Sequence, residues 1–137
     1  MAQLYSDAVR NDRANVIKTH RDAGASAGFT RYYVAPRPTT VGPVTAQLGE
    51  TTFSPVSSPD AVAGVLSASA ISPDAGADAS GVADWYAEFD GDGVMILHGK
   101  LGLTGDVTAD ATVNDLNFVI GLPINVLHNV HTEGNAP

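Results

Sequence analysis

The residues of this chain that could hold a metal ion are aspartates and histidines. Asp90 and Asp92, each followed by glycine, resemble the start of a calcium loop, in which carboxylate oxygens bind the ion. An EF-hand also needs a bidentate carboxylate at its twelfth position, where Leu101 stands. His128 and His131 would lie on opposite faces of a strand. We therefore predict no metal site, with a looser calcium site between strands as the alternative that the sequence leaves open.

The residues that could catalyse a reaction are a serine and several carboxylates. Gly24–Gly28 matches G-x-S-x-G, the nucleophile elbow of α/β-hydrolases, but that elbow needs a strand before the serine and a helix after it. Here the expected order is reversed. Glu88 with Asp90, or Asp106 with Asp110, could act as an acid–base pair, yet any Asp-rich β-protein offers such pairs. We expect no enzymatic activity, no catalytic residue and no cofactor.

The elements that would position these residues are short strands, of which the clearest surround a Gly/Asp cluster. Trp85 and Phe89 alternate with Tyr86, and the alternation resumes over residues 94–98. The residues between them, Asp90–Gly93, tolerate the positive φ angles that hairpin turns require. This pattern predicts a β-hairpin centred on residue 91.

An amphipathic helix is predicted before the strands, over Ala2–Ala23. Its apolar residues recur at helical spacing but are interrupted at Asp12 and Arg13, and Gly24 stands where a C-terminal cap is expected. Such a helix either packs on the body of its own chain, which we take as the default, or projects towards other subunits.

Other strands are predicted throughout the remaining chain, separated by Gly, Pro and Asn/Asp turns. They cover Phe29–Ala35, Val44–Leu48, Thr52–Val56, Val62–Ile71, Lys100–Leu103, Val107–Val113, Leu116–Ile120 and Ile124–Val130. Short strands after one helix predict a mainly β chain, an antiparallel β-sandwich or jelly-roll-like domain preceded by one N-terminal α-helix. We divide it into a helical arm, 1–24, and a sandwich, 29–135.

Length and charge narrow the classes of partner. The 137 residues suit one domain, contain no cysteine, and include no apolar run long enough for a membrane span or a signal peptide. Residues 1–37 carry six Lys and Arg against three Asp, whereas residues 38–137 carry one Lys against twelve Asp and Glu. Because an acidic body repels phosphate groups, we expect a soluble protein that binds neither nucleic acid nor membrane.

The order of motifs resembles small virion structural proteins of tailed bacteriophages. The matching features are the Arg10-Asn11 pair in the helix, the strand and turn residues Gly81, Ala83, Trp85, Tyr86, Asp90 and Gly93, and the closing Gly134-Asn135. An arginine often follows the aromatic pair in that group, and Ala87 stands there instead. Any role of that arginine is therefore not carried over.

The resemblance implies a non-enzymatic, oligomeric protein of the virion, assembled in the host cytoplasm. Its partners would be other virion proteins and copies of itself. A capsid decoration (cement) protein that contacts the major capsid protein is the first expectation, and a neck, collar or tail-associated protein is the alternative. Interfaces combine apolar and aromatic contacts with charges at the rim. The candidate interface residues are Leu4, Tyr5, Val9, Arg10, Arg13, Val16, Ile17, Tyr32, Tyr33 and Arg37.

A carbohydrate-binding β-module is the alternative from another functional class. Exposed Trp85 and Tyr86 would stack on sugar rings, and Asp90 and Asp92 would bind hydroxyl groups. A single tryptophan that alternates into a hairpin is more often a core residue, so this alternative depends on whether Trp85 is exposed.

Overall fold

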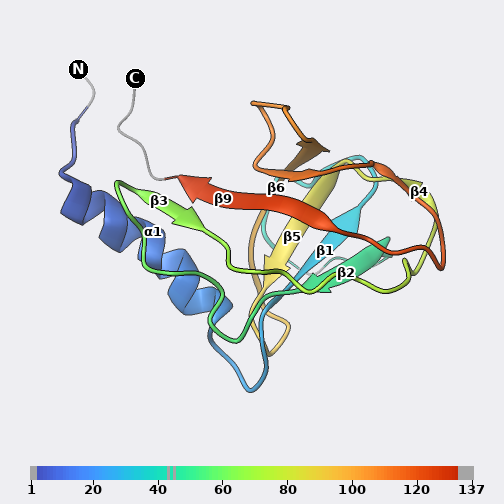
Figure 1. Ribbon diagram of the computed structural model, residues 1–137, viewed down its shortest axis with the longest axis horizontal. Helices are drawn as coiled ribbons and strands as arrows, with labels where there is room; N and C mark the ends of the chain where they lie inside the picture. The colour runs from blue at the N-terminus through green and yellow to red at the C-terminus, as the bar shows by residue number, and fades with distance from the viewer. Residues whose placement is uncertain (1–2, 43, 45, 133–137) are drawn as a thin grey trace.

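The computed structural model describes residues 3–42, 44 and 46–132. One helix precedes nine strands in this part of the chain, which confirms the mainly β class with an N-terminal helix (Figure 1). The elements are α1 (Asp7–Arg21), β1 (Phe29–Tyr33), β2 (Gly49–Thr52), β3 (Val65–Ser67), β4 (Gly81–Val82), β5 (Trp85–Phe89), β6 (Met95–Leu103), β7 (Ala111–Val113), β8 (Asn117–Phe118) and β9 (Val126–Thr132). Within the described ranges, no helix has the length and apolar character to cross a membrane.

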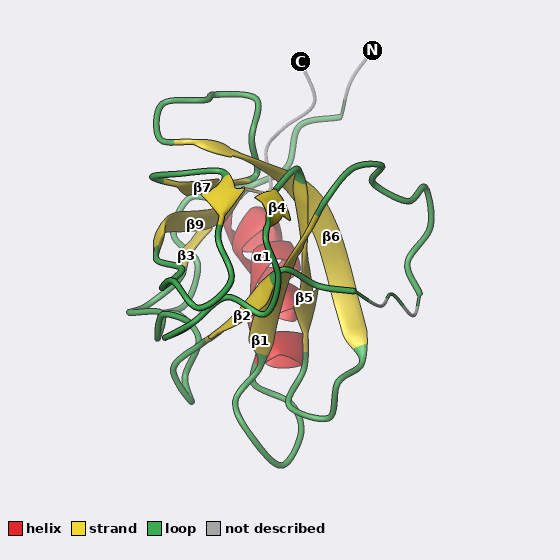
Figure 2. Cartoon of the chain, turned by 90° about the vertical axis from the view of Figure 1, so that its right-hand side faces the viewer, coloured by secondary structure: helices red, strands yellow, loops and turns green. Residues whose placement is uncertain are grey.

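Seven of these strands form one curled sheet in the order β2-β1-β5-β6-β7-β9-β3, and β4 pairs with β8 in a separate ladder. Figure 1 shows α1 at one end of the molecule, beside β3, and Figure 2 shows it behind the strands of the curled sheet. The sandwich arrangement is not confirmed, since these seven strands are continuous rather than divided into two stacked sheets.

The pairing of β6 with β7 is parallel, so the prediction of a wholly antiparallel sheet is wrong for this pair. The sequence pattern predicts a strand over Val107–Val113, but only Ala111–Val113 is extended. Gly105, with a φ of 95°, turns the chain, and Asp106 then accepts a hydrogen bond from the backbone N–H of Thr108. The resulting loop brings the chain back to Leu101, so that β7 begins beside the residue at which its pairing with β6 begins. β7 therefore runs in the same direction as β6.

The predicted hairpin is formed by β5 and β6. Asp90 Oδ1 accepts hydrogen bonds from the backbone N–H groups of Asp92 and Val94, both at 2.9 Å, and so closes the turn. Every residue of β5 is buried, because the curled sheet has a core on each side of this strand. Tyr86 belongs to the larger core, whereas Trp85 packs in the other.

The observed boundaries of several elements differ from the predicted ones where single residues decide the local conformation. α1 begins at Asp7 because Ser6 caps it, and the predicted start at Ala2 falls outside the described residues. Gly49 and Glu50, predicted as a turn, are the first residues of β2, which pairs with β1. Of the strand predicted over Val62–Ile71, only Val65–Ser67 forms a named strand.

Candidate functional site

The helix α1 is joined to the body of the protein by polar contacts along its inner face. Asn11 Oδ1 accepts a hydrogen bond from the backbone N–H of Gly64, and Asn15 Oδ1 accepts one from the backbone N–H of Ala61, both at 2.7 Å. These side-chain carbonyls satisfy two part-buried backbone donors of the loop before β3. The spacing of four residues places both asparagines on one face of the helix.

Apolar packing follows the same inner face. Ala14 is buried against Ala61 and Leu66, and Ile17 packs partly against this cluster. Ile17, predicted as an interface residue, is therefore half-buried within the chain itself.

The C-terminal end of α1 is held by a buried ion pair between Arg21 and Glu88 of β5. Arg21 Nε donates to Glu88 Oε2 at 2.8 Å and Arg21 Nη2 donates to Glu88 Oε1 at 2.7 Å, so the contact is bidentate. The two side chains are 1% and 0% exposed. The guanidinium also lies over the ring of Phe53, 4.7 Å from its centroid. Arg21 is therefore part of the core of the protein, and the last turn of α1 is not a detachable arm.

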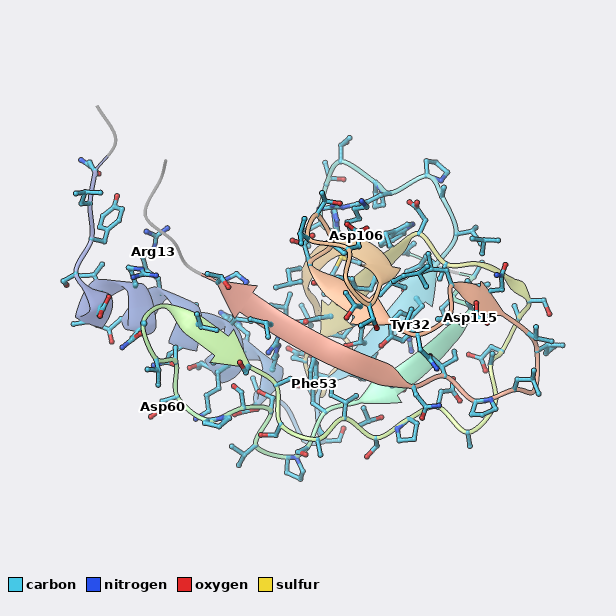
Figure 3. The ribbon with its side chains drawn as sticks, turned by 45° about the horizontal axis from the view of Figure 1, so that its top comes forward. Arg13, Tyr32, Phe53, Asp60, Asp106 and Asp115 are labelled. Atoms are coloured by element: carbon cyan, nitrogen blue, oxygen red, sulfur yellow. The ribbon has the colours of Figure 1, made fainter. Side chains whose placement is uncertain are left out.

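The outer face of α1 and the segment before it carry exposed apolar side chains. Leu4 is 80% exposed and Val16 is 52% exposed, with Tyr5 and Val9 also on the surface. Arg13 lies over the ring of Tyr5, 5.0 Å from its centroid. In Figure 3, Arg13 lies at the end of the molecule opposite to Asp115. The structure thus brings five of the predicted interface residues to one end of the molecule.

The remaining predicted interface residues lie in three different environments. Arg10 is half-buried and pairs with Asp7 at 3.0 Å. Tyr32 and Tyr33 are buried, so placing them at an interface is wrong. Their strand, β1, lies between β2 and β5 in a sheet with a core on both sides, and consecutive side chains therefore point into different cores. Arg37 is exposed in the loop after β1 and donates to the backbone carbonyl of His98 in β6.

The loop after β1 is fastened to β6 by Arg37 and His98. Arg37 Nε donates to His98 Nδ1 at 2.8 Å, and Arg37 Nη2 donates to the backbone carbonyl of His98 at 3.2 Å. His98 Nε2 lies 3.1 Å from the carbonyl oxygen of Thr40. Because Nδ1 accepts from Arg37, the ring is neutral and carries its proton on Nε2, which donates to Thr40. The edge of the same ring meets Trp85.

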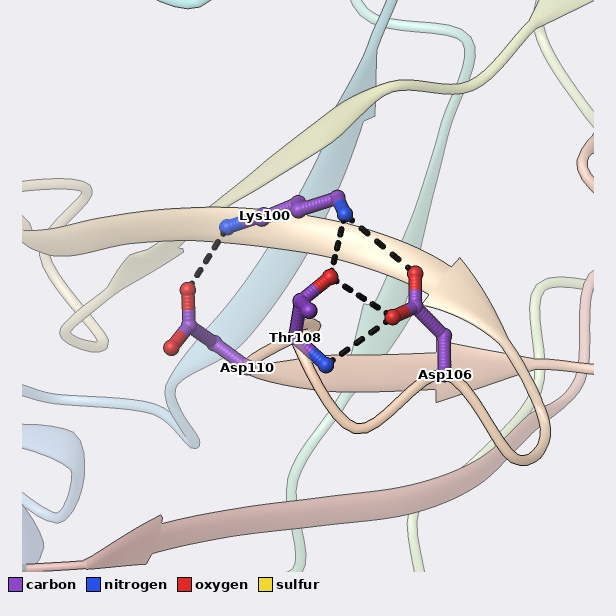
Figure 4. Close-up of polar contacts among 4 residues, drawn as sticks. All are labelled: Lys100, Asp106, Thr108 and Asp110. Atoms are coloured by element: carbon purple, nitrogen blue, oxygen red, sulfur yellow. Dashed lines mark hydrogen bonds and ion pairs between the residues drawn. The ribbon is translucent and has the colours of Figure 1, made fainter.

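The two carboxylate pairs considered for acid–base catalysis are engaged in structural contacts. Glu88 binds Arg21, and Asp90 closes the hairpin turn. Figure 4 shows that Asp106 and Asp110 both bind Lys100, Asp106 through the ammonium group and Asp110 through the backbone N–H. Hydrogen bonds from Thr108, and then the charge of Lys100, hold the pKa of Asp106 below its usual range. All four carboxylates therefore have structural partners.

The serine and metal motifs also have structural explanations. Ser26 donates its hydroxyl proton to the carbonyl of Gly91, which packs the linker after α1 against the β5–β6 turn. A second chain contact at this point runs from the N–H of Gly91 to the carbonyl of Ala23. Among the described residues, no group of three or more His, Asp or Glu side chains could hold a metal ion.

A polar pocket of about 420 Å³ lies beside β6, over the buried Arg21–Glu88 pair. Its polar lining includes Arg37, Tyr86, His98 and Asp110. Sequence reasoning did not find this site, because its residues are far apart in the chain. One signal was present: Glu88 stands within an otherwise apolar strand, and a buried carboxylate requires a cationic or hydrogen-bonding partner.

No protein-family model, curated protein or solved structure matches this chain.

Proposed function

We propose that this protein is a non-enzymatic structural protein of a tailed-bacteriophage virion, and specifically a decoration protein that binds the major capsid protein. The observation that carries the proposal is the division of α1 into two faces. The inner face is fixed to the body through Asn11, Asn15 and Arg21, while the outer face presents Val9 and Val16 to solvent. A rigid helix with exposed apolar side chains suits docking on another protein.

The charge distribution supports the same role. The first 37 residues are net basic and the rest of the chain is strongly acidic. A basic, apolar docking face would contact the particle, and the acidic body would face solvent. Attachment at the neck, collar or tail uses the same surface and is the alternative placement.

Sugar binding through stacked aromatic side chains is not supported. Trp85 is buried, stacks on Tyr33 at a centroid distance of 4.2 Å, and donates its indole proton to the carbonyl of Val34 at 2.8 Å. Tyr86 is buried as well. Neither ring can serve as an exposed platform.

The test is cosedimentation of the full chain with empty heads of the phage whose genome encodes it. Point variants are preferable to truncation, because removing α1 would also remove Arg21 from the core. We expect near-stoichiometric binding by the wild type and a loss of at least about tenfold in affinity for V9E/V16E. V107E is the matched control, since Val107 is an exposed valine in the loop between β6 and β7.

Each result has a definite meaning. Binding to heads that is lost in V9E/V16E and retained in V107E supports the decoration role. Binding to isolated necks or tails alone would replace it with the alternative placement. Absence of binding to any part of the particle, or equal binding by both variants, would contradict the proposed docking face.

A further inference from the structure

Besides the Arg21–Glu88 pair, the pocket beside β6 is lined by one further cationic and one further anionic side chain, Arg37 and Asp110. Arg37 Nη2 donates to the carbonyl of His98, and Asp110 Oδ2 accepts from the backbone N–H of Lys100 at 2.8 Å. These two backbone groups belong to residues i and i+2 of one strand and therefore point to the same edge. The guanidinium and the carboxylate therefore lie along the same edge of β6, and both residues line the pocket.

Neither charge is neutralised by its present contacts. Arg37 binds a neutral imidazole and a carbonyl, and Asp110 binds a backbone N–H. Among the described residues, neither side chain forms a salt bridge. The nearby Arg21–Glu88 pair is internally neutral.

The side chain of Tyr86 reaches the same pocket. Tyr86 is 4% exposed and lines the pocket. Burial, followed by the charges of Glu88 and Asp110, raises the pKa of Tyr86, so the hydroxyl stays protonated and can donate. Gly99 makes room for it: a Cβ atom there would lie 2.7 Å from the Tyr86 hydroxyl oxygen and 2.9 Å from Asp110 Oδ2.

We propose that this pocket binds a small zwitterion, a free L-α-amino acid. The ligand carboxylate accepts hydrogen bonds from Arg37 and from the Tyr86 hydroxyl, and its ammonium group donates to Asp110. Leu97, Ala109 and Val130 form the apolar part of the lining and would receive an aliphatic side chain. The volume of about 420 Å³ is sufficient for an amino acid of the size of leucine.

The charge pattern favours a zwitterion over a simple ion. A lone anion would bind Arg37 but would be repelled by Asp110, and a lone cation would meet the reverse arrangement. A zwitterion carries a negative and a positive charge on one small molecule, so it can pair with Arg37 and with Asp110 at the same time. This inference is independent of the proposed role in the virion.

Isothermal titration calorimetry of the full chain tests the proposal, with L-leucine as the probe and acetate, ethylamine and glucose as comparison ligands. We expect saturable one-to-one binding of L-leucine and affinities at least about tenfold weaker for the three comparison ligands. Equal affinity for acetate or ethylamine, preferential binding of glucose, or no saturation with L-leucine up to about 50 mM would each overturn the proposal.

Three variants identify the groups that bind the ligand. Y86F removes only the hydroxyl and should weaken L-leucine binding about tenfold, the effect of one hydrogen bond to a charged group. D110N should reduce the preference for L-leucine over acetate, because the ammonium group loses its anionic partner. K100Q is the matched control, since its ammonium group faces Asp106 and Thr108 instead, and it should bind like the wild type. Melting temperatures check that each variant is folded, and unchanged binding by folded Y86F and D110N would overturn the assignment.

Discussion

Two of the ion pairs that join α1 to the rest of the chain differ in what surrounds them. Arg21 and Glu88 form a bidentate pair that is excluded from solvent. Lys18 and Asp60 also approach to 2.8 Å, but the Asp60 side chain is 79% exposed. Water solvates the charges of the exposed pair. In the buried pair, by contrast, each charge is compensated by the other side chain, because water is excluded. The comparison teaches that distance alone does not measure the importance of an ion pair.

Breaking the buried pair should have the largest effect. E88Q leaves the Arg21 guanidinium in the core beside a neutral amide, and we expect a loss of about 3–5 kcal/mol in the free energy of unfolding, measured by urea denaturation. The double variant R21M/E88L, which removes both charges, should recover most of this loss. A loss of less than about 1 kcal/mol in E88Q would mean that water reaches the pair in solution.

Alkaline pH should have the second-largest effect on stability, through the buried tyrosines. Burial raises the pKa of Tyr32 and Tyr86 above that of an unfolded tyrosine, about 10, so the folded state retains their protons longer. The stabilisation is complete below about pH 10 and is lost above it, at about 1.4 kcal/mol per tyrosine for each pH unit. Spectrophotometric titration should show these phenols ionising together with unfolding. Gradual ionisation of all tyrosines without loss of structure would contradict their burial.

A smaller effect is expected at Asn15, which precedes both ion pairs in α1. N15A leaves the backbone N–H of Ala61 without its side-chain acceptor, and we expect a loss of about 1–2 kcal/mol in urea denaturation. T19A is the control, because Thr19 is exposed and its hydroxyl returns to the carbonyl of Asn15 in the same helix. Equal stability of the two variants would show that water replaces the Asn15 contact at no cost.

The exposed pair should give the smallest effect. The hydrogen bond from Lys18 to Asp60 raises the pKa of Lys18, but the group is exposed and screened by solvent. We expect K18A to melt at the wild-type temperature, within the precision of a thermal scan. A clear decrease that disappears in about 1 M salt would show that the pair contributes more than its exposure suggests.

The extent to which the sequence predicts this fold depends on how local each feature is. Residues 85–98 predict their hairpin because alternation and an Asp/Gly turn act between neighbours. Residues 107–113 also alternate, yet the loop that contains Gly105 and Asp106 continues into this segment. Only a shorter strand, parallel to β6, forms after it. The alternation of residue types alone could not distinguish the segment that forms a full strand from the segment that forms mostly a loop.

The candidate sites show the same limit. The exposed positions of Leu4, Val9 and Val16 agree with their places in or before a weak apolar stripe. Tyr32 and Tyr33 look equally suitable for an interface in the sequence, and only the neighbours of β1 in the sheet reveal that both are buried.

The sequence by itself determined the mainly β class, the N-terminal helix and the central hairpin, because each depends on contacts between residues close in the chain. Tertiary structure alone decided that Arg21 meets Glu88, 67 residues away, and that Arg37, Tyr86 and Asp110 line one pocket. Such contacts depend on strand order and on the curl of the sheet. Those properties arise from the packing of the whole chain, and no segment of it encodes them separately.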